Sequence, residues 1–301
     1  MLDRRTLLLG SATAAGAILL GACAGNTTTP RPRVRTGYLQ VPGARLYYET
    51  RGSGPPLLMI HGGVADAGSF AAIAPELAEH YTVITYDRRG NSRSRLDGPP
   101  ADLRLDQQAD DAGLLLKTLI DTPPHVFGSS GGAIVALELA TRYRDRLGTV
   151  VAHEPPVPAV LPDAAAQQAK YEAVYQTYRT RGVQEAFQQF MAIDPGEDDP
   201  AADGDYPADP EFGTRIQGNQ EFLLAHEMLP FTRYRPNLAA LRAKLPKLVL
   251  GVGHYRARVA TRIVLTLADR LGTKATPFPG DHTGYIWRPR EFAEKLHAAL
   301  T

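Results

Sequence analysis

The sequence predicts an α/β fold, with a mostly parallel, doubly wound sheet and a helical cap inserted late in the chain. After Tyr38, short apolar runs typical of buried strands alternate with segments in which apolar residues recur at helical spacing. Such alternation favours a parallel sheet covered by helices on both faces. The alternation stops near residue 155 and resumes near residue 235. We therefore expect the interrupted stretch to form a separate layer of helices over the sheet.

The first half of the chain contains most of the predicted strands. Short apolar runs predict strands at residues 45–50, 55–60, 82–87, 125–128 and 149–153. Helical spacing predicts helices at residues 70–81, 105–120 and 133–147. Each of these helices lies between two predicted strands, as in a series of strand–helix–strand units.

The second half predicts the cap and then completes the sheet. Helices without an intervening strand are predicted at residues 164–193 and 219–229, on either side of a polar loop at 194–213. The strand and helix patterns return at residues 246–253, 260–272, 274–280 and 290–300. The predicted domains are a core made of residues 38–154 and 236–301, and a cap made of residues 155–235.

The first 37 residues are predicted to direct export and to lie outside the folded domain. Residues 1–23 combine a charged start, which contains the pair Arg4 and Arg5, with an apolar run that ends at Cys23. This layout is typical of a twin-arginine export signal, and its end resembles a bacterial lipoprotein box with an acylated cysteine. The polar residues 24–37 predict a flexible tether. We expect an exported, extracytoplasmic protein whose lipid on Cys23 anchors it to the cell membrane. An uncleaved spanning anchor is the alternative, although the apolar run is short for one.

Composition argues against several other classes of function. The 33 Lys and Arg nearly balance the 32 Asp and Glu, so a formal net charge of +1 gives no reason to expect nucleic acid. With one cysteine, no disulfide can form within the chain. No histidine–carboxylate cluster has the spacing of a metal site, and no dinucleotide-binding fingerprint is present. We expect a small-molecule substrate and neither metal nor organic cofactor; the oligomeric state is not indicated.

The stretch "HVFGSSGGAIVALELA" carries the strongest chemical signal. It fits the pattern G-x-S-x-G with Ser130 at its centre, after a predicted strand and before a predicted helix. In that context the serine sits on a sharp turn, with its hydroxyl exposed and flanking glycines relieving crowding. Ser129 is expected to serve the turn. A glycine-rich turn that binds phosphate at the helix N-terminus is the alternative.

Two further stretches supply the groups that a nucleophilic serine needs. "LLMIHGGV" ends a predicted strand, and there Gly63 offers a backbone N–H to an oxyanion, with the N–H of Gly131 as the second donor. His61 is expected to be a hydrogen-bonding strut of that loop. "FPGDHTGY" places His282 in a loop near the C-terminus, where it can act as the base, because the order serine then histidine suits this chemistry.

These motifs together resemble the α/β-hydrolase family, across nearly all of residues 38–301. The resemblance is carried by "HGGV", "TYDRRGNSRS", "GSSGG", "HEPP" and "GDHTGY", in family order and approximate spacing. It implies that Ser130 is the nucleophile, His282 the base, and Gly63 and Gly131 the oxyanion-hole amides, below a helical cap. It also implies structural roles for Asp87, Arg89 and Gly90 in the turn after the fourth strand.

The chain departs from the family pattern at the acid of the triad. The family acid usually follows the seventh strand, where this sequence has His254 and Tyr255, and neither can be an anionic partner for His282. Glu154 in "VVAHEPPV" follows the sixth strand and is the predicted replacement, with a structural carboxylate as the alternative reading. Glu227 in the cap is a more distant candidate. Asp281 directly precedes the base and is expected to point away from it.

The predicted function is hydrolysis of an ester-like small molecule, a carboxylic ester, lactone or thioester, through an acyl-enzyme. A serine at the elbow argues against the dehalogenase and epoxide-hydrolase chemistry that uses an aspartate there, while peptide and C–C bond hydrolysis stay open. The competing prediction is a membrane-tethered binding protein that kept the fold and lost much or all of its activity along with the acid.

Overall fold

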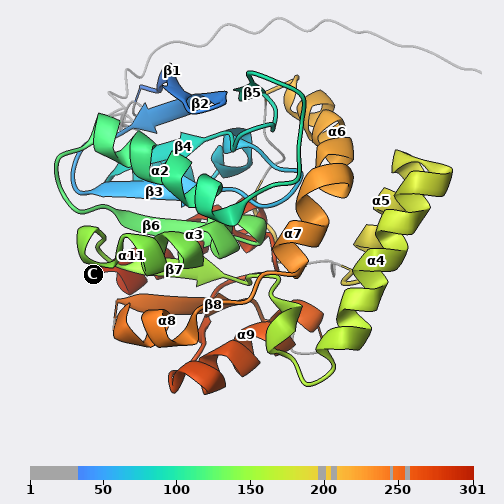
Figure 1. Cartoon of the computed structure of the whole chain (residues 1–301). Coiled ribbons are helices and arrows are strands. Elements are labelled where there is room, and N and C mark those ends of the chain that lie inside the picture. The colour runs from blue at the N-terminus through green and yellow to red at the C-terminus, as the bar shows by residue number, and fades with distance from the viewer. Residues whose placement is uncertain (1–32, 196–200, 205–208, 245–246, 255–257) are drawn as a thin grey trace, which may run out of the picture. The chain divides into compact units, whose positions relative to one another are not determined.

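The computed structural model describes residues 33–195, 201–204, 209–244, 247–254 and 258–301 (Figure 1). The predicted signal, Cys23 and most of the predicted tether therefore lie outside the described residues, as does Tyr255. Within the described residues, no helix is both long and apolar enough to cross a membrane.

The core is one nine-stranded sheet with the strand order β1–β2–β4–β3–β6–β7–β8–β9, counted over the described residues, and β5 pairs with β2. Neighbours from β4 to β9 run parallel, whereas β2 is antiparallel to β1, β4 and β5. The strands are β1 (Arg35–Val41), β2 (Ala44–Arg51), β3 (Pro56–Ile60), β4 (Thr82–Tyr86), β5 (Arg95–Leu96), β6 (His125–Ser129), β7 (Val150–His153), β8 (Leu248–Val252) and β9 (Thr276–Pro277). The predicted mostly parallel sheet is confirmed.

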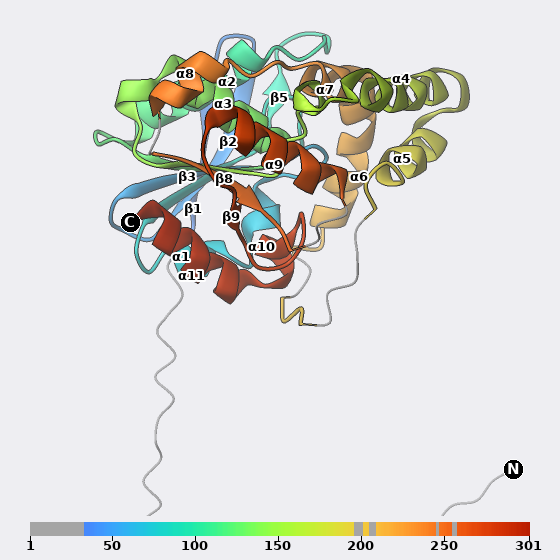
Figure 2. The same cartoon turned by 90° about the horizontal axis from the view of Figure 1, so that it is seen from below.

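Helices cover both faces of the sheet, which explains why the central strands are almost wholly apolar (Figure 2). One apolar cluster joins the sheet to α2 (Leu105–Leu119), α3 (Gly131–Arg142), α8 (Leu238–Lys244) and α9 (Val259–Leu271). A second cluster joins the opposite face to η1 (Ala67–Phe70), α1 (Ala74–Leu77), α10 (Gly284–Trp287) and α11 (Pro289–Leu300). The central parallel strands, β3, β4, β6, β7 and β8, are thus held between two apolar layers, with their carboxyl ends left for loops.

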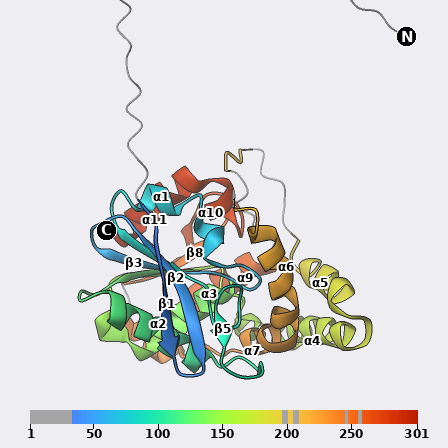
Figure 3. The ribbon, with the colours of Figure 1, turned by 90° about the horizontal axis from the view of Figure 1, so that it is seen from above.

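Among the elements that differ from the sequence prediction, β1, β9 and the predicted helix 70–81 show the reasons best. The strand β1 begins at Arg35, inside the predicted tether 24–37, and pairs residue by residue with β2 (Figure 3). Its outer residues are polar and exposed, so the strand depends on its partner rather than on an apolar pattern. The predicted strand 274–280 keeps only two residues in β9, because its prolines cannot donate to a ladder. The predicted helix 70–81 is reduced to η1 and the four-residue α1.

Between β7 and β8 the chain forms only helices and loops in its described part. The helices are η3 (Pro158–Val160), α4 (Ala164–Arg181), α5 (Val183–Met191), α6 (Phe212–Phe222), the π-helical turn η4 (Leu223–Glu227), α7 (Met228–Thr232) and the core helix α8. Figure 1 shows α4 and α5 side by side, with α6 and α7 between them and the sheet. The segment has an apolar cluster of its own, made of Tyr171, Val174, Ala186, Leu223, Leu224, Met228 and Leu229. Several partly buried aromatic side chains of α4 and α5 pack against this cluster, so they extend the apolar interior of the segment.

Candidate active site

Ser130 occupies a strained turn at the carboxyl end of β6. Its backbone has φ 57° and ψ −125°, a conformation that non-glycine residues rarely adopt, and it immediately precedes α3. The Ser130 N–H donates to the carbonyl of His153 on the neighbouring strand β7, at 2.9 Å. The turn therefore lifts the Ser130 side chain out of the sheet at the N-terminus of a helix, which is the geometry of a nucleophile elbow.

The glycines on either side of Ser130 are required by close backbone contacts. A Cβ at Gly128 would lie 2.3 Å from the carbonyl oxygen of Gly132, and a Cβ at Gly132 would lie 2.1 Å from that of Ile60. Neither position admits a side chain, because real Cβ atoms do not approach backbone so closely. Ser129, in contrast, is fully buried in β6 beside the phenol of Tyr285. Of the two adjacent serines, only Ser130 stands in the turn.

His282 and Glu154 form a hydrogen-bonded pair at the same edge of the sheet. His282 lies in the loop after β9, and its Nδ1 lies 2.7 Å from Oε2 of Glu154, which directly follows β7. The second carboxylate oxygen, Oε1, accepts from the N–H of Gly253 at 2.9 Å. Glu154 is only 2% exposed and, like Ser130, has a positive φ, 48°. Because Nδ1 donates to the carboxylate, Nε2 of His282 is left as the acceptor.

The surroundings of Glu154 keep its carboxyl ionised. Burial alone would raise the pKa of Glu154. The hydrogen bond from His282, the charges of His282 and His153 and the Gly253 amide outweigh burial and lower that pKa to about 2. Glu154 is thus a carboxylate at any ordinary pH, as an acid that orients and stabilises an imidazolium must be.

The usual acid position and Asp281 serve the base loop instead. The backbone N–H of His254 donates to the Gly280 carbonyl at 2.9 Å, and the Gly280 N–H donates to Nδ1 of His254 at 3.2 Å. Oδ1 of Asp281 accepts from both the N–H and the hydroxyl of Thr283, at 2.8 and 2.9 Å. These contacts fix the loop that carries His282 and direct Oδ1 of Asp281 to Thr283, while Oδ2 lies 3.5 Å from Nη1 of Arg258.

The loop after β3, residues 61–66, packs directly against Ser130 and is called the oxyanion loop below. A Cβ at Gly62 would lie 2.9 Å from Cβ of Ser130, so only glycine fits there. Gly131 is the first residue of α3, where backbone N–H groups have no intrahelical partner. A Cβ at Gly63 would meet Leu223 at 3.1 Å, and one at Gly131 would meet Phe231 at 3.0 Å. Both predicted oxyanion glycines thus lie beneath apolar side chains of the cap.

His61 is a strut, in keeping with its expected role. Its Nε2 accepts the backbone N–H of Arg88 at 2.9 Å, so the proton resides on Nδ1, which lies 2.8 Å from the Gly62 carbonyl oxygen. Complete burial, helped by the Arg88 charge, holds the pKa of His61 well below its ordinary value. A neutral histidine with both nitrogens engaged is a structural link between the loop and the turn after β4.

Glu227, the distant candidate for the acid, has a different partner. Its carboxylate makes a bidentate ion pair with Arg88, at 2.6 and 3.0 Å, and both side chains are fully buried. Asn91 adds a hydrogen bond to Oε1 at 3.1 Å. Sequence reasoning missed the role of Arg88. The available signal was an arginine directly after a buried strand, since a buried cation requires a carboxylate partner.

Comparison with known proteins agrees with this architecture. The sequence model of the alpha/beta hydrolase fold family matches residues 55–199. The uncharacterized hydrolase YraK of Bacillus subtilis (strain 168) is 34% identical over 272 residues, which cover 89% of this chain and 96% of that protein.

Two solved structures are also similar. A thermophilic esterase from Thermogutta terrifontis superposes with a TM-score of 0.67 at 22% identity, over 89% of this chain and 100% of that one. A hydrolase from Pseudomonas aeruginosa PA01 superposes with a TM-score of 0.67 at 22% identity, over 92% of this chain and 99% of that one. At such identities the structures support the fold alone, but the YraK match extends over nearly the whole of both chains. The chain therefore belongs to the α/β-hydrolase fold family.

Proposed function

We propose that the protein is a serine hydrolase that cleaves a small ester-like substrate through an acyl-enzyme. The observation that carries this proposal is the set of three side chains at one edge of the sheet: Ser130 on a strained elbow after β6, and the 2.7 Å His282–Glu154 pair after β9 and β7. The Glu154 contact supports the enzyme over the competing prediction of an inactive binding protein, because that prediction rested mainly on the absence of an acid at the usual position.

In the proposed mechanism, Ser130 attacks the substrate carbonyl while Nε2 of His282 accepts the hydroxyl proton. The imidazolium that forms is stabilised by the Glu154 carboxylate. The N–H groups of Gly63 and Gly131 donate to the oxyanion of the tetrahedral intermediate. His282 then gives its proton to the leaving alkoxide or thiolate, and the acyl-enzyme remains. Water, deprotonated by His282, attacks that acyl group and a second collapse restores the Ser130 hydroxyl.

The substrate class we favour is a carboxylic ester, lactone or thioester with a short, apolar acyl group. Leu223 and Phe231 pack over the two oxyanion glycines, and both are 3% exposed. These side chains favour an apolar group next to the reacting carbonyl. The esterase named for the Thermogutta structure is in line with this choice.

An activity-based probe tests the proposal. We expect a fluorophosphonate to label the purified protein at neutral pH, and we expect the Ser130→Ala variant to lose both labelling and hydrolysis of p-nitrophenyl acetate. Ser129→Ala is the matched control, because it removes the adjacent hydroxyl, which lies inside the sheet, and it should keep both. Absence of labelling in the wild-type protein would refute the enzyme and favour the binding protein.

We further propose that the protein is exported and anchored to the membrane by acylation of Cys23. The support is the order of charged, apolar and small residues before that cysteine. Cys23→Ser is expected to release the protein from the membrane fraction of expressing cells. If the variant stayed there, a spanning anchor would explain the retention better.

A further inference from the structure

The backbone carbonyls of the oxyanion loop are held by side chains from outside the loop. Three of these carbonyls accept hydrogen bonds from the side chain of Arg88, which lies in the turn after β4. Its Nε donates to the carbonyl of His61 at 3.2 Å, and its Nη2 donates to those of Gly62 and Gly63 at 3.0 and 3.2 Å. Since the remaining N–H groups of Arg88 face Glu227, its whole guanidinium is engaged.

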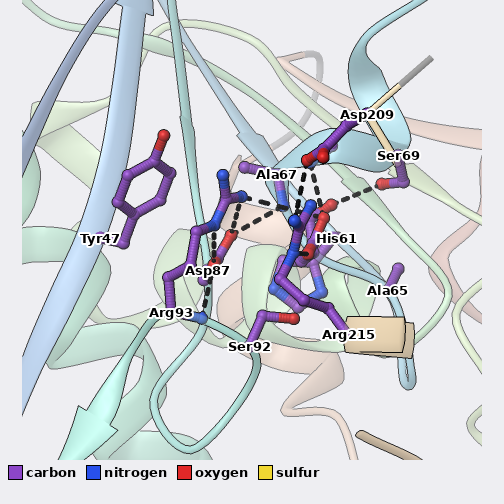
Figure 4. A network of polar contacts seen from close by, with 12 residues as sticks. Tyr47, His61, Ala65, Ala67, Ser69, Asp87, Ser92, Arg93, Asp209 and Arg215 are labelled. Carbon is purple, nitrogen blue, oxygen red and sulfur yellow. Dashed lines mark hydrogen bonds and ion pairs between the residues drawn. The ribbon is translucent and has the colours of Figure 1, made fainter. Parts of the chain in front are cut away.

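The rest of the loop is held by helix α6 of the cap. Nδ2 of Asn219 lies within hydrogen-bond distance of the carbonyls of Val64 and Ala65, at 2.8 and 3.3 Å. One helical turn earlier, Nε of Arg215 donates to Asp66 at 2.6 Å. Figure 4 shows Arg215 beside this loop, with Asp209 as its second partner. Five successive carbonyls, from residue 61 to residue 65, therefore accept hydrogen bonds from two outside side chains.

The Gly62–Gly63 peptide is the unit that matters for the proposed chemistry. In a planar trans peptide the C=O and the N–H point in opposite directions, so fixing one aims the other. The Gly62 carbonyl is bound by Nη2 of Arg88 at 3.0 Å and lies 2.8 Å from Nδ1 of His61. A cationic donor on that carbonyl also polarises the peptide, which makes the Gly63 N–H a stronger donor.

The direction of Arg88 is set in turn by the cap. Glu227 ends the π-helical turn η4, and its bidentate contact with Arg88 leaves the guanidinium no other orientation. Asn91 fixes Oε1 of the same carboxylate. We propose that Arg88 and Glu227 are positioning residues for the oxyanion hole: Glu227 holds Arg88, and Arg88 aims and polarises the Gly63 amide. This inference rests on the proposed function, because the Gly63 amide matters only if an oxyanion forms.

Replacing Arg88 and Glu227 together by apolar residues removes this support of the oxyanion loop and is expected to leave the protein folded. Replacing a buried ion pair by apolar residues of similar volume is often neutral for stability, whereas removing one partner is not. We therefore choose Arg88→Met with Glu227→Leu and p-nitrophenyl acetate as the substrate. Loss of a whole oxyanion donor costs about 10²- to 10³-fold in kcat. For a misaimed donor we expect a fall of about 10- to 100-fold, with KM within about twofold of wild type. The affinity for phenylboronic acid, whose tetrahedral adduct places an oxygen in the hole, should fall by a similar factor.

The neighbouring ion pair provides a matched control. Arg89 makes a bidentate contact with Asp111, at 2.6 Å for both bonds, and is also buried, but its remaining contact is with Pro42 at 3.1 Å. Arg89→Met with Asp111→Leu removes a second buried pair, with side chains 8% and 3% exposed, without touching the oxyanion loop. We expect it to keep the wild-type kcat. The pH dependence of kcat/KM should be the same in all three proteins, because the triad itself is unchanged.

Two outcomes would overturn the inference: a folded double variant with kcat within twofold of wild type, or an equal fall in the control. If the double variant does not fold, Arg88→Lys decides, because it keeps the charge opposite Glu227 and loses the forked donor. Its kcat is expected to fall with unchanged KM, and an unchanged kcat refutes the inference. Amide hydrogen exchange of residues 61–66 separates this idea from the proposed function. Exchange should quicken in Arg88→Met with Glu227→Leu and not in the control, even if the wild type proves inactive.

Discussion

Glu154 and Glu227 are buried glutamates of the same chain, and they face different partners. Glu154 is 2% exposed and contacts His282, whose side chain is 26% exposed. Glu227 is wholly buried and contacts Arg88, which is equally buried and permanently charged. A carboxylate next to a titratable, accessible ring supports proton transfer, while one next to a buried guanidinium fixes geometry. The two glutamates therefore differ in role because their partners differ in chemistry and in exposure to solvent.

The largest expected effect in this comparison is on turnover in Glu154→Gln. The amide can donate to Nδ1 of His282 and so hold the proton on Nε2, where it blocks acceptance of the Ser130 proton. We expect kcat for p-nitrophenyl acetate to fall by about 10⁴-fold. Unfolding free energy should fall by only about 1–3 kcal/mol, since both hydrogen bonds of residue 154 are kept but no longer involve a buried charge. Steady-state kinetics together with urea unfolding check both values; unchanged kinetics would exclude Glu154 as the acid.

Ser130 and His282 could be proposed as nucleophile and base from the sequence because their signals are local. They stand in short motifs whose strand and turn context is readable from a few neighbours. The position of Glu154, the proposed acid, depends on sheet order: β7 lies between β6 and β8, so the residue after β7 comes close to both the elbow and the loop of His282. Arg88 and Glu227 are 139 positions apart in the sequence. The position of Arg88 after a buried strand indicates that it needs a carboxylate partner, but no local pattern identifies Glu227 as that partner. The edge strand β1 escaped prediction for a related reason, as its polar residues are ordered by pairing with β2.

The next largest effect is on stability in Glu227→Gln. This change leaves the Arg88 guanidinium buried without its counter-charge, and breaking one side of a buried pair typically costs about 3–5 kcal/mol. The unfolding free energy from urea denaturation should therefore fall more than it does in Glu154→Gln. If Glu154→Gln and Glu227→Gln lost the same unfolding free energy, the difference that we infer between the partners His282 and Arg88 would be wrong.

A buried histidine next to Glu154, His153, is expected to make the stability of the protein depend on pH. It directly precedes Glu154, is fully buried among aromatic rings, and neither of its ring nitrogens has a hydrogen-bond partner among the described residues. Burial lowers the pKa of His153 to about 4, against an ordinary value of 6.5. The unfolded chain therefore binds more protons between these pH values, and stability falls as the pH drops from 6.5 through 4. At 1.36 kcal/mol for each pH unit, the loss is roughly 3 kcal/mol.

His153→Phe should abolish that part of the pH dependence. At pH 7 the variant is expected to be at least as stable as wild type, because two unpaired polar atoms leave the core. Near pH 4 it should be more stable by roughly 3 kcal/mol, since it cannot take up the proton. Urea unfolding at intervals between pH 7 and pH 4 measures the difference. Parallel curves for the two proteins would show that His153 is not held neutral beside the triad.

The smallest expected effect is on the unfolding free energy of Glu185→Gln, an exposed glutamate that serves as the reference for the two buried ones. Arg181 and Glu185 face each other at 3.5 Å at the junction of α4 and α5, with side chains 70% and 55% exposed. Water and salt screen such a pair, so Glu185→Gln should change the unfolding free energy by less than about 0.5 kcal/mol. The same urea measurement at low and high salt checks this value. A loss comparable to that of Glu227→Gln would mean that burial is not what gives the Arg88–Glu227 pair its weight.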